Sequence, residues 1–161
     1  VEQTGYLNFR LRSMVVSFLT HLLWQPWQSG AGHLARQFLD YEPGIHFSQF
    51  QMQAGTTGIN TIRIYNPIKQ SMEKDKEGIF VRKWVPELAK LPNEYIHEPW
   101  KLSEMDCLLY DFILGKNYPK PIVDFEIAYK NARDKLWELK KTDKNKTNTK
   151  KILNRHVRKR R

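Results

Sequence analysis

The sequence predicts an all-α protein, and two observations support this prediction. Apolar residues recur at helical spacing in residues 7–23, 79–88, 105–113 and 124–141. Proline or glycine residues separate these segments, where they end one helix or begin the next. The chain has 161 residues, of which 40% are hydrophobic, so one modest core is possible. We therefore expect a small helical body.

The first helix is expected over residues 7–23, because a proline at position 26 disfavours helical backbone just before it. Trp24 and Trp27 should lie in the turn that follows. Arg10 and Arg12 fall on opposite flanks of the apolar stripe of this helix. One guanidinium can therefore face outward while the other turns inward to a carboxylate, which its planar fork binds well.

A second helical pattern, in residues 34–39, stops at the motif Asp40-Tyr41-Glu42-Pro43. The proline can begin the next helix as its first residue, and the free N–H groups of that helix favour negative charge nearby. Two carboxylates thus lie at a helix junction. His46 and a run of amide and aromatic residues follow, up to a turn at residues 55–58. We interpret residues 34–67 as one wall of a polar-rimmed pocket.

Three later helices are expected. Residues 79–88 form a short apolar stripe bounded by prolines. Ser103 and Asp106 form a capping-box pattern before apolar residues that continue at helical spacing to Gly115. Asp124 begins a final helix that reaches about Lys141, with Ile127, Leu136 and Leu139 facing inward.

The charge is concentrated at the carboxyl end. The net charge is +10, and residues 140–161 hold 11 of the 27 basic residues but only one of the 17 acidic ones. We therefore divide the chain into a folded body, residues 1–141, and a basic flexible tail, residues 142–161, with at most a helical piece near Ile152. Such a tail either binds polyanions by counterion release or only aids solubility.

Composition also limits location and chemistry. A single cysteine, Cys107, suits a reducing compartment, and we expect the protein in the cytoplasm. The longest apolar run, residues 14–24, is too short to span a bilayer, so no membrane is expected as a partner. No nucleophile motif and no metal-ligand spacing occurs, and we predict neither a catalytic residue nor a metal site in this chain.

Four segments in unbroken order between Thr4 and Trp100 resemble a known family. They read TGYLNFRLRSMVVSFL, FLDYEPGIHFSQFQMQAGTTG, TIRIYNPIKQSMEKDKEGIFVRKWVPEL and HEPW. They are similar to the carboxyl-terminal half of the FAD-binding domain of DNA photolyases and cryptochromes, which is helical. The resemblance implies that an antenna domain and the first half of the flavin domain, with its phosphate clamp, precede Val1. The isolated chain is then expected to be inactive.

The resemblance also implies FAD as the cofactor and assigns the pocket residues. Arg12 matches the arginine that pairs with a carboxylate beneath the flavin, and Asp40 matches that carboxylate. Glu42 matches the second acidic position, with Tyr41 between the two. His46 falls where the family places the side chain that faces flavin N5, which is usually asparagine in photolyases and varied in cryptochromes.

Two further groups of residues follow from the resemblance. Trp27 coincides with the middle tryptophan of a three-tryptophan chain that carries electrons to photoexcited flavin, but Phe50 replaces the flavin-proximal tryptophan. The usual relay is then broken unless another aromatic residue provides a detour. For DNA contact the family uses an Asn-Arg step where this chain has Asn8, Phe9 and Arg10, and Arg63 lies in a loop that borders the DNA-binding face.

Three functions stay open at this stage. The preferred one is a carbon-carbon lyase that uses light and reduced FAD to split cyclobutane pyrimidine dimers. Its expected partners are UV-damaged DNA and the missing amino-terminal part of the same protein. The second is a cryptochrome-type blue-light photoreceptor, which the departures at Phe9, His46 and Phe50 favour. The third is a non-enzymatic nucleic-acid-binding module that relies on the basic tail.

Overall fold

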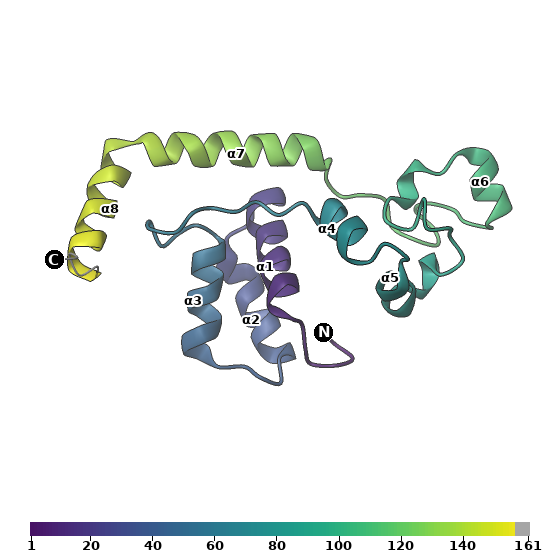
Figure 1. Ribbon diagram of the computed structural model, residues 1–161, viewed down its shortest axis with the longest axis horizontal. Coiled ribbons are helices and arrows are strands. Elements are labelled where there is room, and N and C mark those ends of the chain that lie inside the picture. Colours follow the sequence, from purple (N-terminus) through teal and green to yellow (C-terminus); the bar gives the residue numbers. More distant parts are fainter. Residues whose placement is uncertain (157–161) are drawn as a thin grey trace. The chain divides into compact units, whose positions relative to one another are not determined.

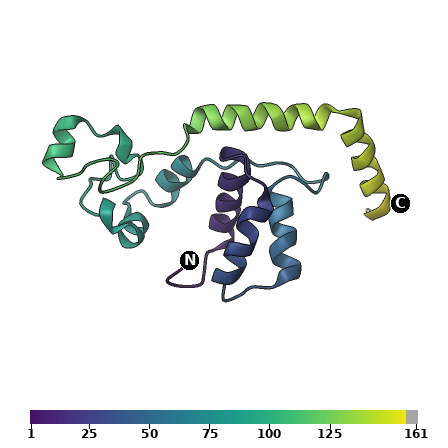
Figure 2. The same cartoon turned by 180° about the vertical axis from the view of Figure 1, so that it is seen from behind.

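The computed structural model describes residues 1–156, and the regular elements in this range are helices (Figures 1 and 2). They are α1 (Phe9–Ser17), a π-helical turn (Phe18–Leu22), α2 (Trp27–Gln37), α3 (Pro43–Gln53), α4 (Pro67–Lys74), α5 (Ile79–Trp84), α6 (Glu104–Leu109), α7 (Phe125–Lys141) and α8 (Asp143–His156), with 3-10 turns at Pro86–Leu88 and Pro99–Lys101. The all-α prediction is confirmed.

The chain forms two compact units, each with its own core. The first contains residues 1–65 and continues from Phe125, and the second contains residues 66–124. The core of the first unit is built from Val16, Ala31, Leu34, Phe38 and Phe50. The core of the second is built from Leu88, Leu91, Ile96 and Phe112. The boundary that we placed between residues 141 and 142 is a different division of the chain and stays a prediction.

The first helical segment ends at Leu22, one residue before the predicted position, and its last turn is π-helical. Thr20 Oγ1 donates to the Val16 carbonyl at 2.8 Å within this segment. The expectation that Trp27 lies in the following turn is wrong, because Trp27 is the first residue of α2. Pro26 adopts an extended backbone with φ −63° and ψ 140°, which suits the residue just before a helix.

The junction before α3 follows the predicted rule. Pro43 is the first residue of α3, and Glu42 caps the helix by accepting hydrogen bonds from Gly44 N and Ile45 N. After α3 the chain turns at Gly55 and Gly58, both with φ +76°, a conformation that glycine adopts without steric cost.

In the second unit, a side-chain cap begins α6. Ser103 and Asp106 form the predicted capping box at the start of α6. The expectation that this helix continues to Gly115 is wrong, because Asp111 has φ +48° and takes the chain out of the helix after Leu109. Leu108 and Leu109 are therefore exposed on a short helix instead of packing along a long one.

Residues 125–156 differ from the prediction in two ways. Helix α7 has the expected bounds, yet Ala132 is its buried residue, whereas Ile127 and Leu139 are 63% and 55% exposed, so their inward placement was wrong. Residues 143–156 form α8 instead of an irregular tail. The Thr149 hydroxyl donates to the Gly58 carbonyl at 2.9 Å, which gives this polar helix a tertiary contact.

The last part of the predicted tail, residues 157–161, lies outside the described residues. No helix in the described part of the chain is both long and apolar enough to cross a membrane.

Gly78 provides a test of the second unit. Its φ is +64°, and a Cβ there would lie 2.7 Å from Ile96 Cδ1 and 2.9 Å from Ile96 Cγ2 in the core. We predict that Gly78→Ala lowers the free energy of unfolding by about 1–3 kcal/mol. Chemical denaturation followed by circular dichroism measures this change.

Gly32→Ala is the matched control. This glycine lies inside α2 with open space around its Cα, since the nearest atom that a Cβ would meet is 3.8 Å away. The control should therefore raise the free energy of unfolding by about 0.5–1 kcal/mol. Equal effects of the two substitutions would contradict this account.

Candidate functional site

Arg12 connects α1 to the segment between α2 and α3. Its Nη2 donates to both carboxylate oxygens of Asp40, at 2.8 and 2.9 Å, and its Nε donates to the Leu7 carbonyl at 2.6 Å. The guanidinium carbon lies 4.0 Å from the centre of the Phe38 ring. Hydrogen bonds and ring packing together fix the orientation of this side chain. The structure thus brings together the two residues that the sequence predicted to pair.

This ion pair is exposed enough for water to screen it. The Arg12 and Asp40 side chains are 28% and 53% exposed. Pairs of this kind contribute about 0–1 kcal/mol to stability. The main consequence of the contact is therefore geometric, because it holds a charged donor and a charged acceptor side by side.

Glu42 has a different local role from Asp40. Its Oε1 accepts from Gly44 N at 3.1 Å and its Oε2 accepts from Ile45 N at 2.7 Å. The carboxylate thereby satisfies N–H groups that a helix start leaves free. Glu42 is locked in place, and only its remaining lone pairs are available to another molecule.

His46 is buried, with 8% of its surface exposed. Its Nε2 lies 2.9 Å from the Ala31 carbonyl, which can only accept, so Nε2 carries the proton. The ring centre lies 5.3 Å from that of Tyr41 and 4.8 Å from that of Phe50. The protonated nitrogen thus faces α2, and the imidazole is held within an aromatic cluster.

These side chains line one cavity of about 210 Å³. Two buried oxygens in its lining, Ser13 Oγ and Gln49 Oε1, have no hydrogen-bond partner among the described residues. An unpaired buried polar atom costs about 1–3 kcal/mol, so such atoms favour a bound polar group. The full lining consists of Phe9, Arg12, Ser13, Val16, Leu34, Phe38, Asp40, Tyr41, Glu42, Ile45, His46, Gln49, Phe50 and Gln53.

Sequence reasoning did not identify Ser13 as a site residue, although a signal was present. Ser13, Ser17 and Thr20 recur at helical spacing inside an otherwise apolar segment, which marks a polar stripe on a buried face. Gln49 was placed in the pocket wall but received no role. Phe38 received no role either, yet it lines the cavity and packs against the guanidinium of Arg12.

The predicted electron-transfer residue lies at the edge of the same cluster. The ring centre of Trp27 is 6.5 Å from that of Phe50 and 6.4 Å from that of Phe47, which is in turn 6.5 Å from Tyr41. Trp24 is 45% exposed and packs against Lys135. Both ring contacts of Trp27 in this cluster are therefore to phenylalanines, Phe50 directly and Phe47 on the way to Tyr41.

The residues predicted to contact DNA occupy separate positions. Asn8 caps α1, since its side chain accepts from Leu11 N at 3.0 Å. Phe9 is 61% exposed and lines the cavity, and Arg10 is exposed on the next position of α1. Arg63 is also exposed but is not part of the cavity lining. The cavity thus brings together one of the four, Phe9, with the predicted cofactor residues.

A second buried polar contact joins the last residue of α1 to the π-helical turn. Tyr65 N donates to Ser17 Oγ at 3.0 Å, which leaves the hydroxyl proton for His21 Nδ1 at 3.1 Å. Burial lowers the pKa of His21 below its ordinary value of 6.5, and the Ala54 carbonyl partly opposes this shift. His21 is therefore neutral in the folded protein at neutral pH.

Comparison with known proteins identifies the family. Residues 1–138 match the family described as the FAD binding domain of DNA photolyase. The chain belongs to the photolyase and cryptochrome family. It is 39% identical over 130 residues to a deoxyribodipyrimidine photo-lyase of Alkalihalophilus pseudofirmus, covering 80% of this chain and 27% of that protein. It is 36% identical over 139 residues to a cryptochrome DASH of Gloeobacter violaceus, covering 84% and 28%.

Solved structures of the photolyase and cryptochrome family agree with this assignment. A bacterial class III photolyase from Agrobacterium tumefaciens is 35% identical with a TM-score of 0.78, covering 87% of this chain and 30% of that one. A cryptochrome from Synechocystis is 34% identical with a TM-score of 0.76, covering 81% and 27%. The chain thus spans somewhat more than a quarter of the length of these relatives. The relatives carry both names, photolyase and cryptochrome.

His21 makes stability depend on pH. Because its pKa is lower in the folded state, the unfolded chain binds more protons, and stability rises with pH. We predict that the contribution of His21 to the free energy of unfolding is complete above pH 6.5. The free energy of unfolding should fall as the pH drops below that value. Denaturation at a series of pH values should show a smaller loss in His21→Asn than in the unmodified protein. The control His33→Asn, at an exposed position, should keep the full loss. Identical pH profiles for all three proteins would contradict the assignment.

Proposed function

We propose that the intact protein binds FAD noncovalently and uses it to split cyclobutane pyrimidine dimers in DNA with light. One observation carries the proposal. In a chain of this family, an oriented arginine and carboxylate border a cavity that also contains two unpaired buried oxygens.

The polar groups of the cavity fit the edge of a flavin ring. That edge offers an imide N–H between two carbonyl oxygens, so it needs an acceptor beside donors. Asp40 supplies an acceptor and Arg12 a donor, while the Ser13 hydroxyl can serve as either. Gln49 Oε1 supplies a second acceptor. Apolar neighbours such as Phe38 exclude water, which strengthens these interactions.

The size of the cavity limits what this chain does alone. Ligand pockets usually measure about 300–1,000 Å³, whereas this cavity measures about 210 Å³. It suits the ring system better than a whole dinucleotide. We therefore propose that an amino-terminal part of the same protein supplies the groups that hold the phosphates, and that this chain alone binds FAD weakly.

The chemistry that FAD supplies when bound is electron donation to the lesion under light. The residues of this chain bind the flavin ring and fix its orientation. Arg12 neutralises negative charge beside Asp40, and His46 stays fixed by its bond to Ala31. An exposed aromatic residue, Phe9, lies at the rim, where a base flipped out of the duplex can stack.

A cryptochrome-type photoreceptor is the second candidate, and the residue at position 50 favours it. Phe50 is 4% exposed and packs between Trp27 and His46, where a phenylalanine is much harder to oxidise than a tryptophan. The discriminating experiment is repair of dimer-containing DNA by the intact protein under blue light. Repair supports the lyase, and flavin binding with no repair supports the photoreceptor.

Asp40→Asn tests the cofactor site, because it removes the charge and keeps the size. Charge-assisted hydrogen bonds contribute about 1.5–3 kcal/mol, so the dissociation constant for FAD should rise about tenfold or more. The free energy of unfolding should change by less than about 1 kcal/mol, since the pair is half-exposed. Flavin fluorescence titration and urea unfolding of the intact protein give the two quantities.

Asp134→Asn is the matched control. Asp134 pairs with Arg133 at 2.9 Å, both side chains are exposed, and neither is part of the cavity lining. It should leave FAD affinity unchanged. If both substitutions weaken FAD binding equally, or neither does, the proposed site is wrong.

Trp27→Phe tests the electron path. Because both ring paths from Trp27 toward the cavity, the direct one through Phe50 and the one through Phe47 to Tyr41, pass through a phenylalanine that is hard to oxidise, Trp27 should contribute little, and we predict that this substitution leaves most photoreduction intact. The rate of flavin bleaching under blue light with an external reductant measures it. Trp137→Phe, at a 61% exposed position of α7, is the control. A near-complete loss in Trp27→Phe alone would show that the main path still runs through Trp27.

A further inference from the structure

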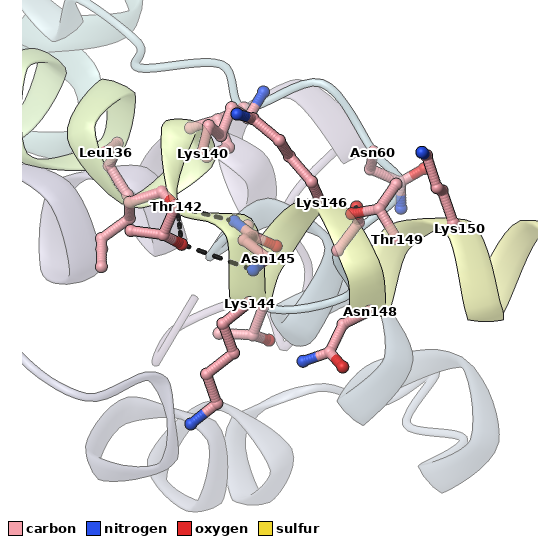
Figure 3. A pocket seen from close by; sticks show the side chains of 15 residues that line it. Asn60, Leu136, Lys140, Thr142, Lys144, Asn145, Lys146, Asn148, Thr149 and Lys150 are labelled. Carbon is pink, nitrogen blue, oxygen red and sulfur yellow. Dashed lines mark hydrogen bonds between the residues drawn. The ribbon is translucent and has the colours of Figure 1, made fainter.

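A second cavity lies in the first unit, between α8, the end of α7 and the loop from Gly55 to Ile62. It measures about 570 Å³ and is open to solvent (Figure 3). The hydrogen bond from Thr149 to the Gly58 carbonyl holds α8 against the loop, although the two residues are 91 positions apart. Ile152 packs at the same place, because its Cδ1 lies 3.3 Å from where a Cβ on Gly58 would be. The fold itself therefore builds this hollow from three segments.

The cavity lining is strongly basic. Lys140, Lys144, Lys146 and Lys150 belong to it, and none of the described lining residues is acidic. Asp143 lies next to it and contacts Lys146 at 3.3 Å, but the two side chains are 98% and 59% exposed, so water screens this pair. Like charges around a hollow raise the local concentration of anions.

Three of the four lining lysines extend to the same side of α8. In Figure 3 the side chains of Lys140, Lys146 and Lys150 extend to the side of α8 on which Asn60 lies, and Lys144 extends to the opposite side. Three ammonium groups and an amide thus border one side of the hollow.

The residue types indicate which anion fits. The described lining holds lysine, asparagine and threonine side chains over apolar residues such as Leu136 and Ile62, and it contains no arginine and no aromatic ring. Lysine binds phosphate as a point charge, and amides and hydroxyls add contacts to phosphate oxygens. Base recognition instead uses bidentate arginine or stacked aromatic rings.

We propose that this hollow is a binding site for the phosphate backbone of nucleic acid, used without sequence preference. It is separate from the cavity of Arg12 and Asp40 and needs neither flavin nor light. All four of its lysines lie beyond residues 1–138, which match the family. The proposal therefore concerns a feature that the family match does not cover.

A membrane surface is disfavoured as the partner. Helices that lie on membranes bury an apolar face, whereas the only apolar residues of Asp143–His156 are Ile152 and Leu153. Ile152 already packs at Gly58. The helix therefore offers charge without an apolar face for lipid.

The experiment uses the intact protein and a short, undamaged, mixed-sequence DNA duplex in the dark, across a salt series. The test variant changes Lys140, Lys146 and Lys150 to Gln. The control variant changes Lys76, Lys90 and Lys116 to Gln, which removes the same charge from exposed positions of the second unit. Circular dichroism checks that both variants keep their helices, and vesicles of anionic phospholipid serve as a second probe.

We expect the test variant to bind DNA about tenfold more weakly or worse than the control. Each lost phosphate contact flattens the plot of log affinity against log salt by about 0.9 for duplex DNA, so the slope should fall by about 2–3 in the test variant alone. An equal loss of DNA affinity in the two variants would overturn the proposed site, because it would show only a general attraction between the basic protein and DNA. Lost vesicle binding with unchanged DNA binding would overturn it as well, in favour of a membrane surface.

Discussion

The contact between Arg12 and Asp40 is the constraint on which the site depends. It spans 28 positions and ties α1 to the junction of α2 and α3, which are otherwise joined by apolar packing around Ala31 and Phe50. Because the pair is half-exposed, its main effect is on position and not on stability. The cavity exists where these helices meet, and its polar groups are arranged around this contact.

The sequence predicted those parts of the fold that local chemistry decides. Pro43 begins α3, Ser103 and Asp106 cap α6, and α7 ends at Lys141, because each follows from caps, prolines and short-range spacing. The failures depend on distant contacts or on single backbone angles. The left-handed backbone of Asp111 ends α6 early, and the docking of Thr149 on Gly58 accompanies an α8 that composition alone argued against.

The candidate site shows the same division. The contact of Arg12 with Asp40 was expected, because the two positions match an arginine and a carboxylate that pair in the family. Glu42 was expected beside a ligand, and the structure adds that it caps α3. Ser13 and Gln49 were not assigned, since only the assembled cavity shows that their oxygens lack partners. The basic tail was predicted from its charge. The cavity that it forms with the loop at Gly55 could not be predicted, because segments far apart in the sequence line it.

The central claim is that Arg12 and Asp40 act as one unit in holding FAD. A double-mutant cycle tests it most directly, with Arg12→Gln, Asp40→Asn and the double variant of the intact protein, by FAD dissociation constants. The account predicts that the double variant loses little more affinity than either single variant, because each substitution already disrupts the shared arrangement. Losses that add fully in the double variant would show two independent residues and contradict the claim.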